Sequence, residues 1–430
     1  MNFEYVISGM TMGTGDLYYN KSALSPYASV FNDKITFMDN KYSNQNISML
    51  FNSHCEPTHG ECINELMPSW HNLFADSGGL QLSRTKKGLT PEVKDKIYKH
   101  QAQYSDVAMI FDDIPTEFDQ SNTGWSMKTS TTGRRFVRDL VKDKAMSTMV
   151  NCKRQIEVFD QMGSDAKISL IVQGQDLSSY KEYIETIVGG MTNDELSKCT
   201  GISLSSACSG IGFTNRAEMI YAVKEFDIPM ELKENIHLLG VGSHEMMIPF
   251  FVSPNYFDFV KNVSYDSSTQ ANSWFFSRYR DKDWNNIDMD SPATTKKSKE
   301  IIYETQLIPV FSDLYESNKN AFQQFGINDF DFLIQESTKW SDKNTEKKRL
   351  YNSDIGFDGS KLLPFFNQMQ VVEHFMDWVN KYVEDPTLIN SKGLASVSTY
   401  EDFMLYWLPL QGKQDKLEEH FSSTLEGFFE

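Results

Sequence analysis

The segment Ile168-Ser-Leu-Ile-Val-Gln-Gly174 shows most clearly the unit that decides the fold, a short apolar run that ends in a polar residue and glycine. A run this rich in Ile, Leu and Val suits a strand that is buried on both faces. The stretch Tyr180–Met191, which has helical period, follows it. Similar runs lie at Asn72–Asp76, Val107–Asp113, Gly201–Ser205, Ile236–Gly242 and Phe257–Asp266. Further stretches with helical period lie between them, at Pro91–Tyr104, Arg134–Met162 and Asn215–Phe226.

This alternation of runs predicts the fold class. Repeated strand–helix units of this length predict a parallel sheet, and six or more of them predict an α/β fold of the (β/α)8 barrel type. An open, doubly wound sheet is the alternative, but no Gly-x-Gly-x-x-Gly turn opens a helix after the first strand. In a barrel, functional side chains are expected at the carboxyl ends of the strands, where these apolar runs end.

The pattern changes after about residue 285. The stretch Asp281–Lys299 is polar and is predicted to be a linker or an exposed loop. Beyond it, Leu362–Val383 is the clearest amphipathic helix. Two polar stretches, Ser337–Lys348 and Asn390–Ser398, are predicted to be surface loops. We therefore expect a barrel domain over residues 1–285 and a mainly helical region over residues 286–430.

Length and composition agree with an intracellular protein that is large enough for a barrel. The chain has 430 residues, of which 40% are hydrophobic, and this suits a barrel of roughly 250 to 300 residues with an appendage. No apolar stretch approaches the ~20 residues that span a bilayer, and Met1–Tyr5 lacks the layout of a secretory signal. We therefore expect a cytoplasmic protein with no membrane partner. The five cysteines are odd in number and mostly scattered, which argues against a disulfide framework.

The net charge of −18 argues against a protein that coats nucleic acid non-specifically. Locally, however, Met127–Arg154 carries eight basic residues against two acidic ones. Arg134, Arg135 and Arg138 in this stretch are weak candidates for contacts with phosphate groups. A solvated helix face explains the charges at least as well.

The segment Phe74-Ala-Asp-Ser-Gly-Gly-Leu-Gln-Leu82 places one carboxylate, Asp76, at the end of an apolar run. Ser77 and Gly78 follow it, and glycine lets a backbone turn sharply and come close to a ligand. The segment therefore predicts a buried strand that presents an acid at its carboxyl end.

Two further runs end in side chains that suit a planar, polar ligand. Asp112 and Asp113 end the first run, and because neighbouring residues of a strand point to opposite faces, only one can face the barrel mouth. Gln173 ends the second run and offers both a donor and an acceptor, which suits the edge of a nucleobase. An aspartate that caps a turn, or an amide that caps a loop, is the structural alternative.

Three later segments complete the series. Gly201-Ile-Ser-Leu204 and Leu238-Leu-Gly-Val-Gly242 both contain glycine, and small residues such as Gly240 permit flat packing over a ring. A turn at the end of a strand explains Gly240 and Gly242 equally well. The last segment contains two aspartates, Asp258 and Asp266, that compete for one catalytic role.

In this order the motifs resemble those of the tRNA-guanine transglycosylase superfamily, over roughly residues 70 to 270. Tyr265-Asp-Ser-Ser268 is similar to the family's Phe-Asp-Ser nucleophile motif, and the surroundings of Asp258 are not. The resemblance therefore implies that Asp266 is the nucleophile and that Asp76 transfers protons. Two carboxylates that face each other across a barrel mouth suit displacement at an anomeric carbon.

The resemblance also implies a base pocket and a reaction. Asp112 and Gln173 would bind the base, and Asp113 would be a structural neighbour. The other implied contacts to the substrate are Ser77, Gly78, Gly201 and Gly240. The implied reaction exchanges guanine in a nucleic acid for a free 7-deazaguanine base through a covalent intermediate on the nucleophile.

The family's zinc motif, Cys-x-Cys-x-x-Cys with a downstream His, is absent because no cysteine follows Cys208. We therefore expect no cofactor. A different cluster, His54-Cys55-x-x-x-His59-x-x-Cys62, carries four donors of the kinds that bind zinc. Cys55, His59 and Cys62 are weak candidates for metal ligands, and a plain loop with reduced thiols is the preferred interpretation.

The expected nucleic-acid partner is DNA. The family's tRNA enzymes carry the zinc motif and a Pro-Thr-Arg-x-Ala-Arg segment, where this chain has Ser268-Thr-Gln-Ala-Asn-Ser273. A branch of the family found in phages and bacteria places 7-deazaguanines in DNA and diverges at these two features. tRNA remains the alternative substrate. A barrel glycoside hydrolase and a non-catalytic partner subunit are alternatives from other classes, and a homodimer is left open.

Overall fold

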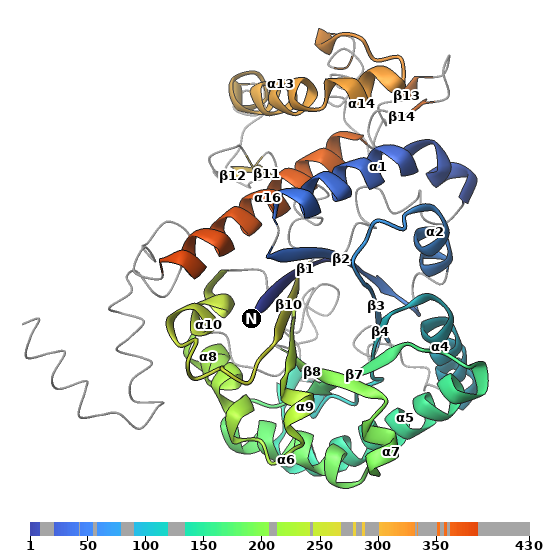
Figure 1. Ribbon diagram of the computed structural model, residues 1–430, viewed down its shortest axis with the longest axis vertical. Helices are drawn as coiled ribbons and strands as arrows, with labels where there is room; N and C mark the ends of the chain where they lie inside the picture. Colours follow the sequence, from blue (N-terminus) through green and yellow to red (C-terminus); the bar gives the residue numbers. More distant parts are fainter. Residues whose placement is uncertain are drawn as a thin grey trace, which may run out of the picture.

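A closed barrel of eight parallel strands forms the centre of the computed structural model (Figure 1). The strands follow one another around the barrel in the order β1-β10-β9-β8-β7-β4-β3-β2. Their bounds are β1 (Asn2–Ser8), β2 (Gln45–Asn52), β3 (Leu73–Asp76), β4 (Val107–Met109), β7 (Lys167–Val172), β8 (Cys199–Ser205), β9 (Asn235–Leu239) and β10 (Asn262–Ser267). The predicted (β/α)8 barrel is confirmed.

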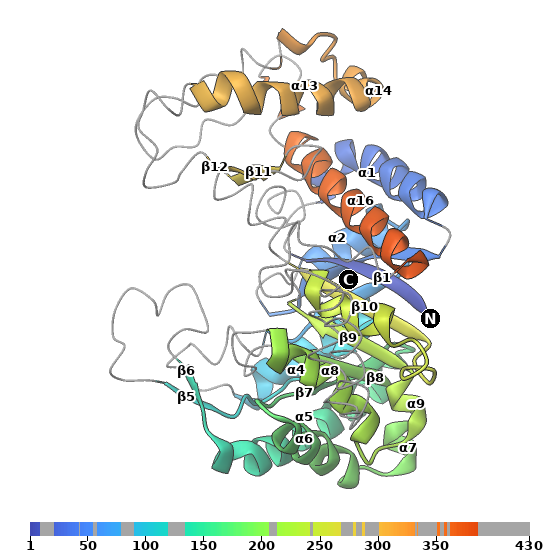
Figure 2. The same ribbon diagram turned by 90° about the vertical axis from the view of Figure 1, so that its left-hand side faces the viewer.

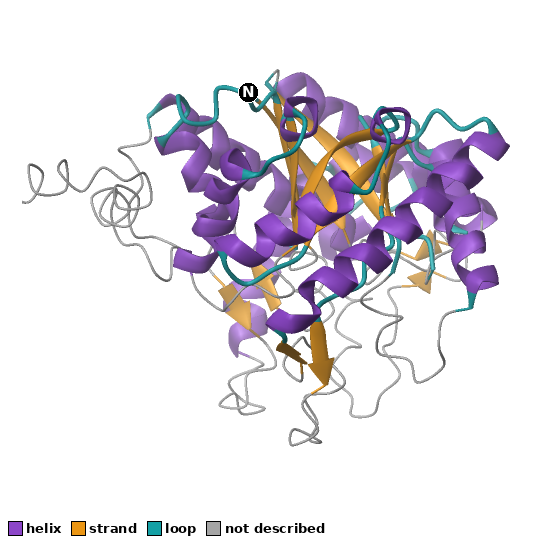
Figure 3. Ribbon diagram, turned by 90° about the horizontal axis from the view of Figure 1, so that it is seen from below, coloured by secondary structure: helices purple, strands orange, loops and turns teal. Residues whose placement is uncertain are grey.

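The structure describes residues 1–8, 21–42, 44–54, 58–78, 90–118, 134–205, 213–240, 244–267, 278–280, 286–288, 301–331, 333, 351–352, 357–358 and 362–385. Helices enclose the barrel on its outside (Figure 3). They are α1 (Lys21–Lys41), α2 (His59–Leu66), α4 (Pro91–Tyr104), α5 (Val141–Met162), α6 (Leu177–Gly189), α7 (Asn193–Leu196), α8 (Phe213–Ala222), α9 (Met230–Lys233) and α10 (Ile248–Val252).

Several predicted boundaries differ from the observed ones. The prediction of one helix over Arg134–Met162 is wrong at its start, because Arg134–Phe136 forms strand β6 and pairs antiparallel with β5 (Thr116–Phe118). The Val137 N–H also donates to the Pro115 carbonyl, 3.0 Å away, which draws this segment away from the helix. Strand β10 begins at Asn262, since the chain at Phe257 is in a turn. Strands β1 and β2 lie outside the predicted runs altogether.

The barrel interior is polar at the amino-terminal ends of the strands. The Ser48 hydroxyl donates to the Glu4 carboxylate, which also accepts from Asn72 Nδ2 at 2.8 Å. Ser169 and Ser203 share a hydrogen bond of 2.6 Å between their hydroxyl oxygens. Barrel interiors are more usually filled with branched aliphatic side chains. Here a cavity of about 320 Å³, lined in part by these polar groups, occupies that end of the barrel.

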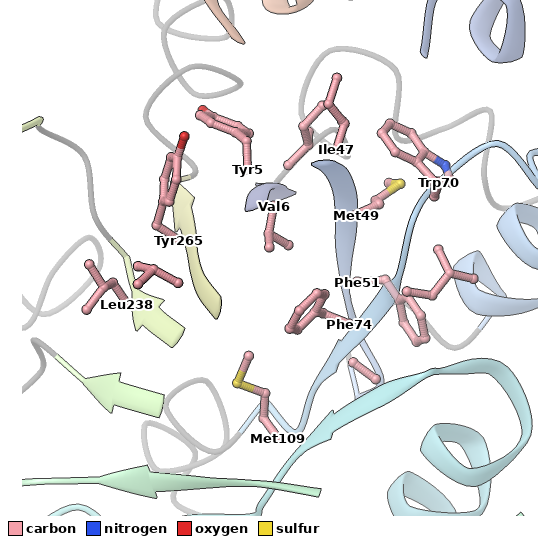
Figure 4. Close-up of a cluster of buried hydrophobic side chains, with 14 of the residues drawn as sticks. Tyr5, Val6, Ile47, Met49, Phe51, Trp70, Phe74, Met109, Leu238 and Tyr265 are labelled. Carbon is pink, nitrogen blue, oxygen red and sulfur yellow. The ribbon is translucent and has the colours of Figure 1, made fainter. Parts of the chain in front are cut away.

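The hydrophobic core lies instead between the sheet and the helices. Tyr5 pairs in register with both Ile47 and Tyr265, and all three side chains are almost completely buried. Figure 4 shows these three on one side of the strands, with Val6 and Phe74 on the interior side. Because successive side chains of a strand point to opposite faces of the sheet, the apolar side chains under the helices are separated from the polar side chains inside the barrel.

A late helix, α16 (Leu362–Glu384), packs on this outer core beside α1 (Figure 1). Its Phe365 stacks on Phe31 of α1, and its Phe375 contacts both Tyr5 and Tyr265 with ring centroids 5.4 and 5.0 Å apart. The predicted amphipathic helix is therefore confirmed, and it covers the seam where β1 meets β10.

The rest of the region after the barrel strands is described in part. It contains helices α13 (Ile308–Ser317) and α14 (Lys319–Gln324) and two short antiparallel pairs, β11 (Arg278–Arg280) with β12 (Asn286–Asp288) and β13 (Tyr351–Asn352) with β14 (Phe357–Asp358). The predicted loops Ser337–Lys348 and Asn390–Ser398 lie outside the described residues. The domain boundary near residue 285 stays a prediction. Within the described part of the chain, every helix is too short or too polar to cross a membrane.

Gly201 tests the packing between β8 and β9. A Cβ at this position would lie 2.2 Å from the Asn235 carbonyl oxygen, so an alanine would force the two strands apart. We expect Gly201→Ala to lower the free energy of unfolding by about 1–3 kcal/mol in denaturant titrations. Gly189→Ala is the matched control, because no atom lies within 4 Å of its added Cβ. An equal effect of both substitutions would contradict this packing.

Candidate active site

Five of the predicted residues meet at the carboxyl end of the barrel. Asp76 is the last residue of β3, and Asp266 is the last residue but one of β10. Asp112, Gln173 and Gly240 follow the ends of β4, β7 and β9. Parallel strands end on the same side of a barrel, so these residues surround one mouth. The mouth faces the side on which the β5–β6 and β11–β12 pairs lie (Figure 2).

Asp112 and Gln173 form a buried polar pair. Gln173 Nε2 donates to Asp112 Oδ2 at 2.6 Å. Gln173 is only 1% exposed and Asp112 only 7%. The remaining acceptor of the amide, Gln173 Oε1, has no hydrogen-bond partner among the described residues. A buried acceptor without a partner costs free energy, so the pair is suited to receive a ligand that donates to it.

The environment of Asp112 favours its protonated form. Burial, together with the nearby negative charge of Asp76, raises the pKa of Asp112 to about 7, against the lowering effect of the Gln173 hydrogen bond. Because Asp76 acts on this carboxyl group, the two acids lie near each other at the mouth. A carboxyl group that titrates near neutral pH is characteristic of functional sites.

Asp113, in the segment after β4, turns away from the mouth. Its backbone N–H donates to Thr148 Oγ1 at 2.8 Å, its carbonyl accepts from the Tyr183 hydroxyl at 2.9 Å, and its carboxylate accepts from Ser147. These partners belong to α5 and α6, which lie outside the barrel. Asp113 is thus a structural neighbour that anchors the strand end carrying Asp112.

Asp266 is buried and held through one of its two oxygens. The Gly240 backbone N–H donates to Asp266 Oδ1 at 2.8 Å, and His237 Nε2 lies 3.3 Å from the same oxygen. Among the described residues, none forms a hydrogen bond or an ion pair with Oδ2. A carboxylate fixed in this way keeps one oxygen available for attack on a substrate. Gly240, expected as a contact to the base, thus orients the acid.

Asp76 is supported from the neighbouring strand. Asn52, its register partner on β2, donates from Nδ2 to Asp76 Oδ2 at 3.0 Å. Asn52 Oδ1 in turn accepts from the His54 backbone N–H at 3.0 Å. Gly78 has a φ of 75°, and a Cβ there would lie 2.9 Å from Asn52 Oδ1, so glycine is required for this turn. Ser77, between them, is fully buried.

A ring stack connects the two acids across the barrel. His237 of β9 stacks on Phe74 of β3 with ring centroids 5.3 Å apart and an interplanar angle of 26°. Phe74 lies two residues before Asp76 on the same face of its strand, and His237 contacts Asp266. The stack therefore joins the strands that carry the two carboxylates, and it lies on the amino-terminal side of both acids.

The structure does not bring Gly201 to this site. Gly201 is near the start of β8 and lines the cavity at the amino-terminal end of the barrel, away from the mouth at which its contact to the substrate was expected. Its lack of a side chain is explained by the close approach of the Asn235 backbone. Ser205 is the residue of β8 that reaches the mouth, and it is buried.

The three arginines predicted to contact phosphate groups lie on different elements. Arg134 and Arg135 are in β6, and their side chains lie outside the described part of the structure. Arg138 forms an ion pair with Glu182, and its Nη2 donates to Ser178 Oγ at 3.1 Å. This pairing fits the alternative of a solvated surface. The three arginines remain weak candidates.

The weak metal candidates do not assemble in the described structure. His59 and Cys62 lie on α2 and are buried, whereas Cys55 lies outside the described residues. Within the described ranges, no group of three or more His, Cys, Asp or Glu side chains could hold a metal ion.

Two residues of the site, Asn52 and His237, were not predicted. Asn52 lies at the end of a strand that the apolar pattern did not reveal. His237 lies within a predicted run but is not one of its terminal residues. Their importance depends on which residues stand beside them on adjacent strands, and His237 pairs in register with Ser264 in the strand of Asp266.

Comparison with known proteins adds no assignment. No model of a known protein family matches the chain, and no curated protein matches it in sequence.

The raised pKa of Asp112 predicts a loss of stability with increasing pH. The folded protein keeps a proton that the unfolded chain, with a pKa near 3.8, has released, so the free energy of unfolding falls as pH rises from about 4 to about 7. The full difference corresponds to about 4 kcal/mol. We expect Asp112→Asn, which carries no charge at any of these pH values, to gain stability relative to the wild type between pH 4 and pH 8.

Denaturant titrations of both proteins at the two pH values measure this gain, because the titrations of the other groups cancel in the difference. Asp258→Asn, at an exposed position, is the matched control and should show a constant difference. A constant difference for Asp112→Asn would contradict the assignment.

Proposed function

We propose that this protein is a base-exchange transglycosylase that replaces guanine in DNA with a 7-deazaguanine derivative. The observation that carries the proposal is a buried Asp112–Gln173 pair that lies beside two acids from separate strands, Asp76 and Asp266. A single site of this kind combines recognition of a planar, polar base with displacement at a sugar carbon.

The base pocket suits guanine by its hydrogen-bonding groups. The Watson–Crick edge of guanine has two adjacent kinds of N–H donor, at N1 and N2, and one acceptor, O6. An ionised Asp112 accepts from the donors, as planar carboxylates do with forked donors. The amide of Gln173 can both donate and accept at the remaining positions. 7-Deazaguanine has the same edge, so one pocket serves both the leaving and the entering base.

The proposed reaction consists of two successive displacements at C1′ of the nucleotide. Asp266 attacks C1′, a C1′–oxygen bond forms, and the bond from C1′ to N9 of guanine breaks. Asp76 supplies the proton that the leaving base takes. The incoming 7-deazaguanine then loses its N9 proton to Asp76, and its N9 displaces Asp266 from C1′. No electrons are gained or lost, and the contacts of Asp266 with Gly240 and of Asp76 with Asn52 hold both acids in place.

The nucleic acid has to present its target nucleotide outside the base stack, which costs a few kcal/mol in a duplex. The paired strands β5 and β6 lie on the mouth side of the barrel (Figure 2), and β6 contains Arg134 and Arg135, which we propose as contacts to the phosphate backbone. DNA is favoured over tRNA by the sequence, because the zinc motif and the basic segment of the tRNA enzymes are missing.

Incubation of the protein with labelled guanine and either duplex DNA or tRNA tests the substrate. We expect label to enter DNA, and incorporation into tRNA alone would favour the alternative. Asp266→Asn should reduce the exchange rate by at least roughly 10³-fold, because the nucleophile is lost. Asp258→Asn is the matched control, an aspartate from the same segment that is exposed. If both variants lose activity equally, or neither does, Asp266 is not the nucleophile.

The pKa of Asp112 also predicts how base binding depends on pH. Guanine donates to the ionised carboxylate, and with a pKa of about 7 only about 1% of the free sites are ionised at pH 5. We expect the affinity for guanine, measured by calorimetry or by competition, to rise roughly 100-fold from pH 5 to pH 8. Asp112→Asn should bind weakly and with no such rise. An affinity of the wild type that stays constant would exclude this mode of recognition.

A further inference from the structure

His237 is a buried side chain with a polar atom near each of its ring nitrogens. It is 3% exposed, its Nδ1 lies 2.9 Å from Ser264 Oγ, and its Nε2 lies 3.3 Å from Asp266 Oδ1. One face of the ring stacks on Phe74. These contacts join three strands, β3, β9 and β10, directly below the carboxylate of Asp266.

The chemistry of the partners determines which ring nitrogen carries the hydrogen. An ionised carboxylate only accepts hydrogen bonds, so a neutral ring has to place its hydrogen on Nε2, toward Asp266. Nδ1 is then an acceptor, and the Ser264 hydroxyl donates to it. The Nε2–Oδ1 pair is within reach but lacks the alignment of a hydrogen bond. Such contacts often align only when substrate binds.

We propose that His237 is a positioning residue for Asp266, an inference that rests on the proposed transglycosylase function. Together with the Gly240 N–H, it keeps Oδ1 of the carboxylate engaged, so that Oδ2 is directed at C1′ of the nucleotide. The Phe74 ring prevents the imidazole from turning aside. His237 also lines the cavity of about 320 Å³ at the amino-terminal end of the barrel, so its ring lies between that cavity and the carboxylate of Asp266.

Two substitutions separate positioning from simple packing. His237→Gln keeps an N–H group near the place of Nε2, whereas His237→Asn keeps one near the place of Nδ1 and is too short to reach Asp266. We expect the glutamine variant to retain kcat within about 10-fold and the asparagine variant to lose roughly 10²-fold. KM for the base should stay unchanged in both, because Asp112 and Gln173 are intact. His71→Asn, an exposed histidine at the same cavity, is the control and should keep full activity.

A second measurement does not depend on the reaction. A double-mutant cycle of His237→Asn and Asp266→Ala compares the equilibrium constants for unfolding of the two single variants and the double variant. We expect the effect of the double substitution on this constant to differ by at least ~2-fold from the product of the two single effects. If the wild type exchanges no base in DNA or tRNA, the proposed function fails, and the cycle still decides whether the two side chains interact. An additive cycle, or equal losses of kcat in the glutamine and asparagine variants, overturns the assignment of His237.

Discussion

The register of the seam between β1 and β10 is the constraint on which the site depends. Val6 stands opposite Asp266 and Tyr5 opposite Tyr265, so closure of the barrel places the carboxylate inside and the two tyrosines outside. A slip of one residue would exchange these faces, because side chains alternate along a strand. Helix α16 secures the register, since Phe375 packs on both tyrosines. A helix more than ninety residues after β10 in the chain thus helps to hold the carboxylate of Asp266 inward.

Stability and chemistry occupy different faces of the same strands. The outer faces carry the aromatic and aliphatic side chains that pack under the helices, and burial of such surface is the main source of stability. The inner faces carry Glu4, several serines, His237 and the acids at the mouth. Burying Asp112 with a raised pKa opposes folding at neutral pH. The outer core has to offset this cost, as is common where a site needs a destabilised group.

The apolar runs were sufficient to predict the barrel and the strands that end in Asp76, Gln173 and Asp266, because each run and its terminal residue are contiguous in sequence. Asn52 and His237 could not be found in this way, since each matters through a neighbour on another strand. Gly201 misled because a glycine required by a close strand–strand contact looks the same in sequence as one required by a ligand. Arg134 was predicted to lie in a helix because its pairing partner in β5 is distant in sequence, so the local pattern does not reveal the pairing.

In the proposed reaction, a pKa of about 7 for the Asp112 carboxyl group would ease the exchange of one base for another. If Asp112 were fully ionised in the empty site, guanine and 7-deazaguanine would both be held at full strength, and release of the displaced base would be slow. A proton that returns to Asp112 when the base leaves stabilises the empty site and so weakens binding of either base equally. Burial of Asp112 therefore favours release of the displaced base in the proposed reaction.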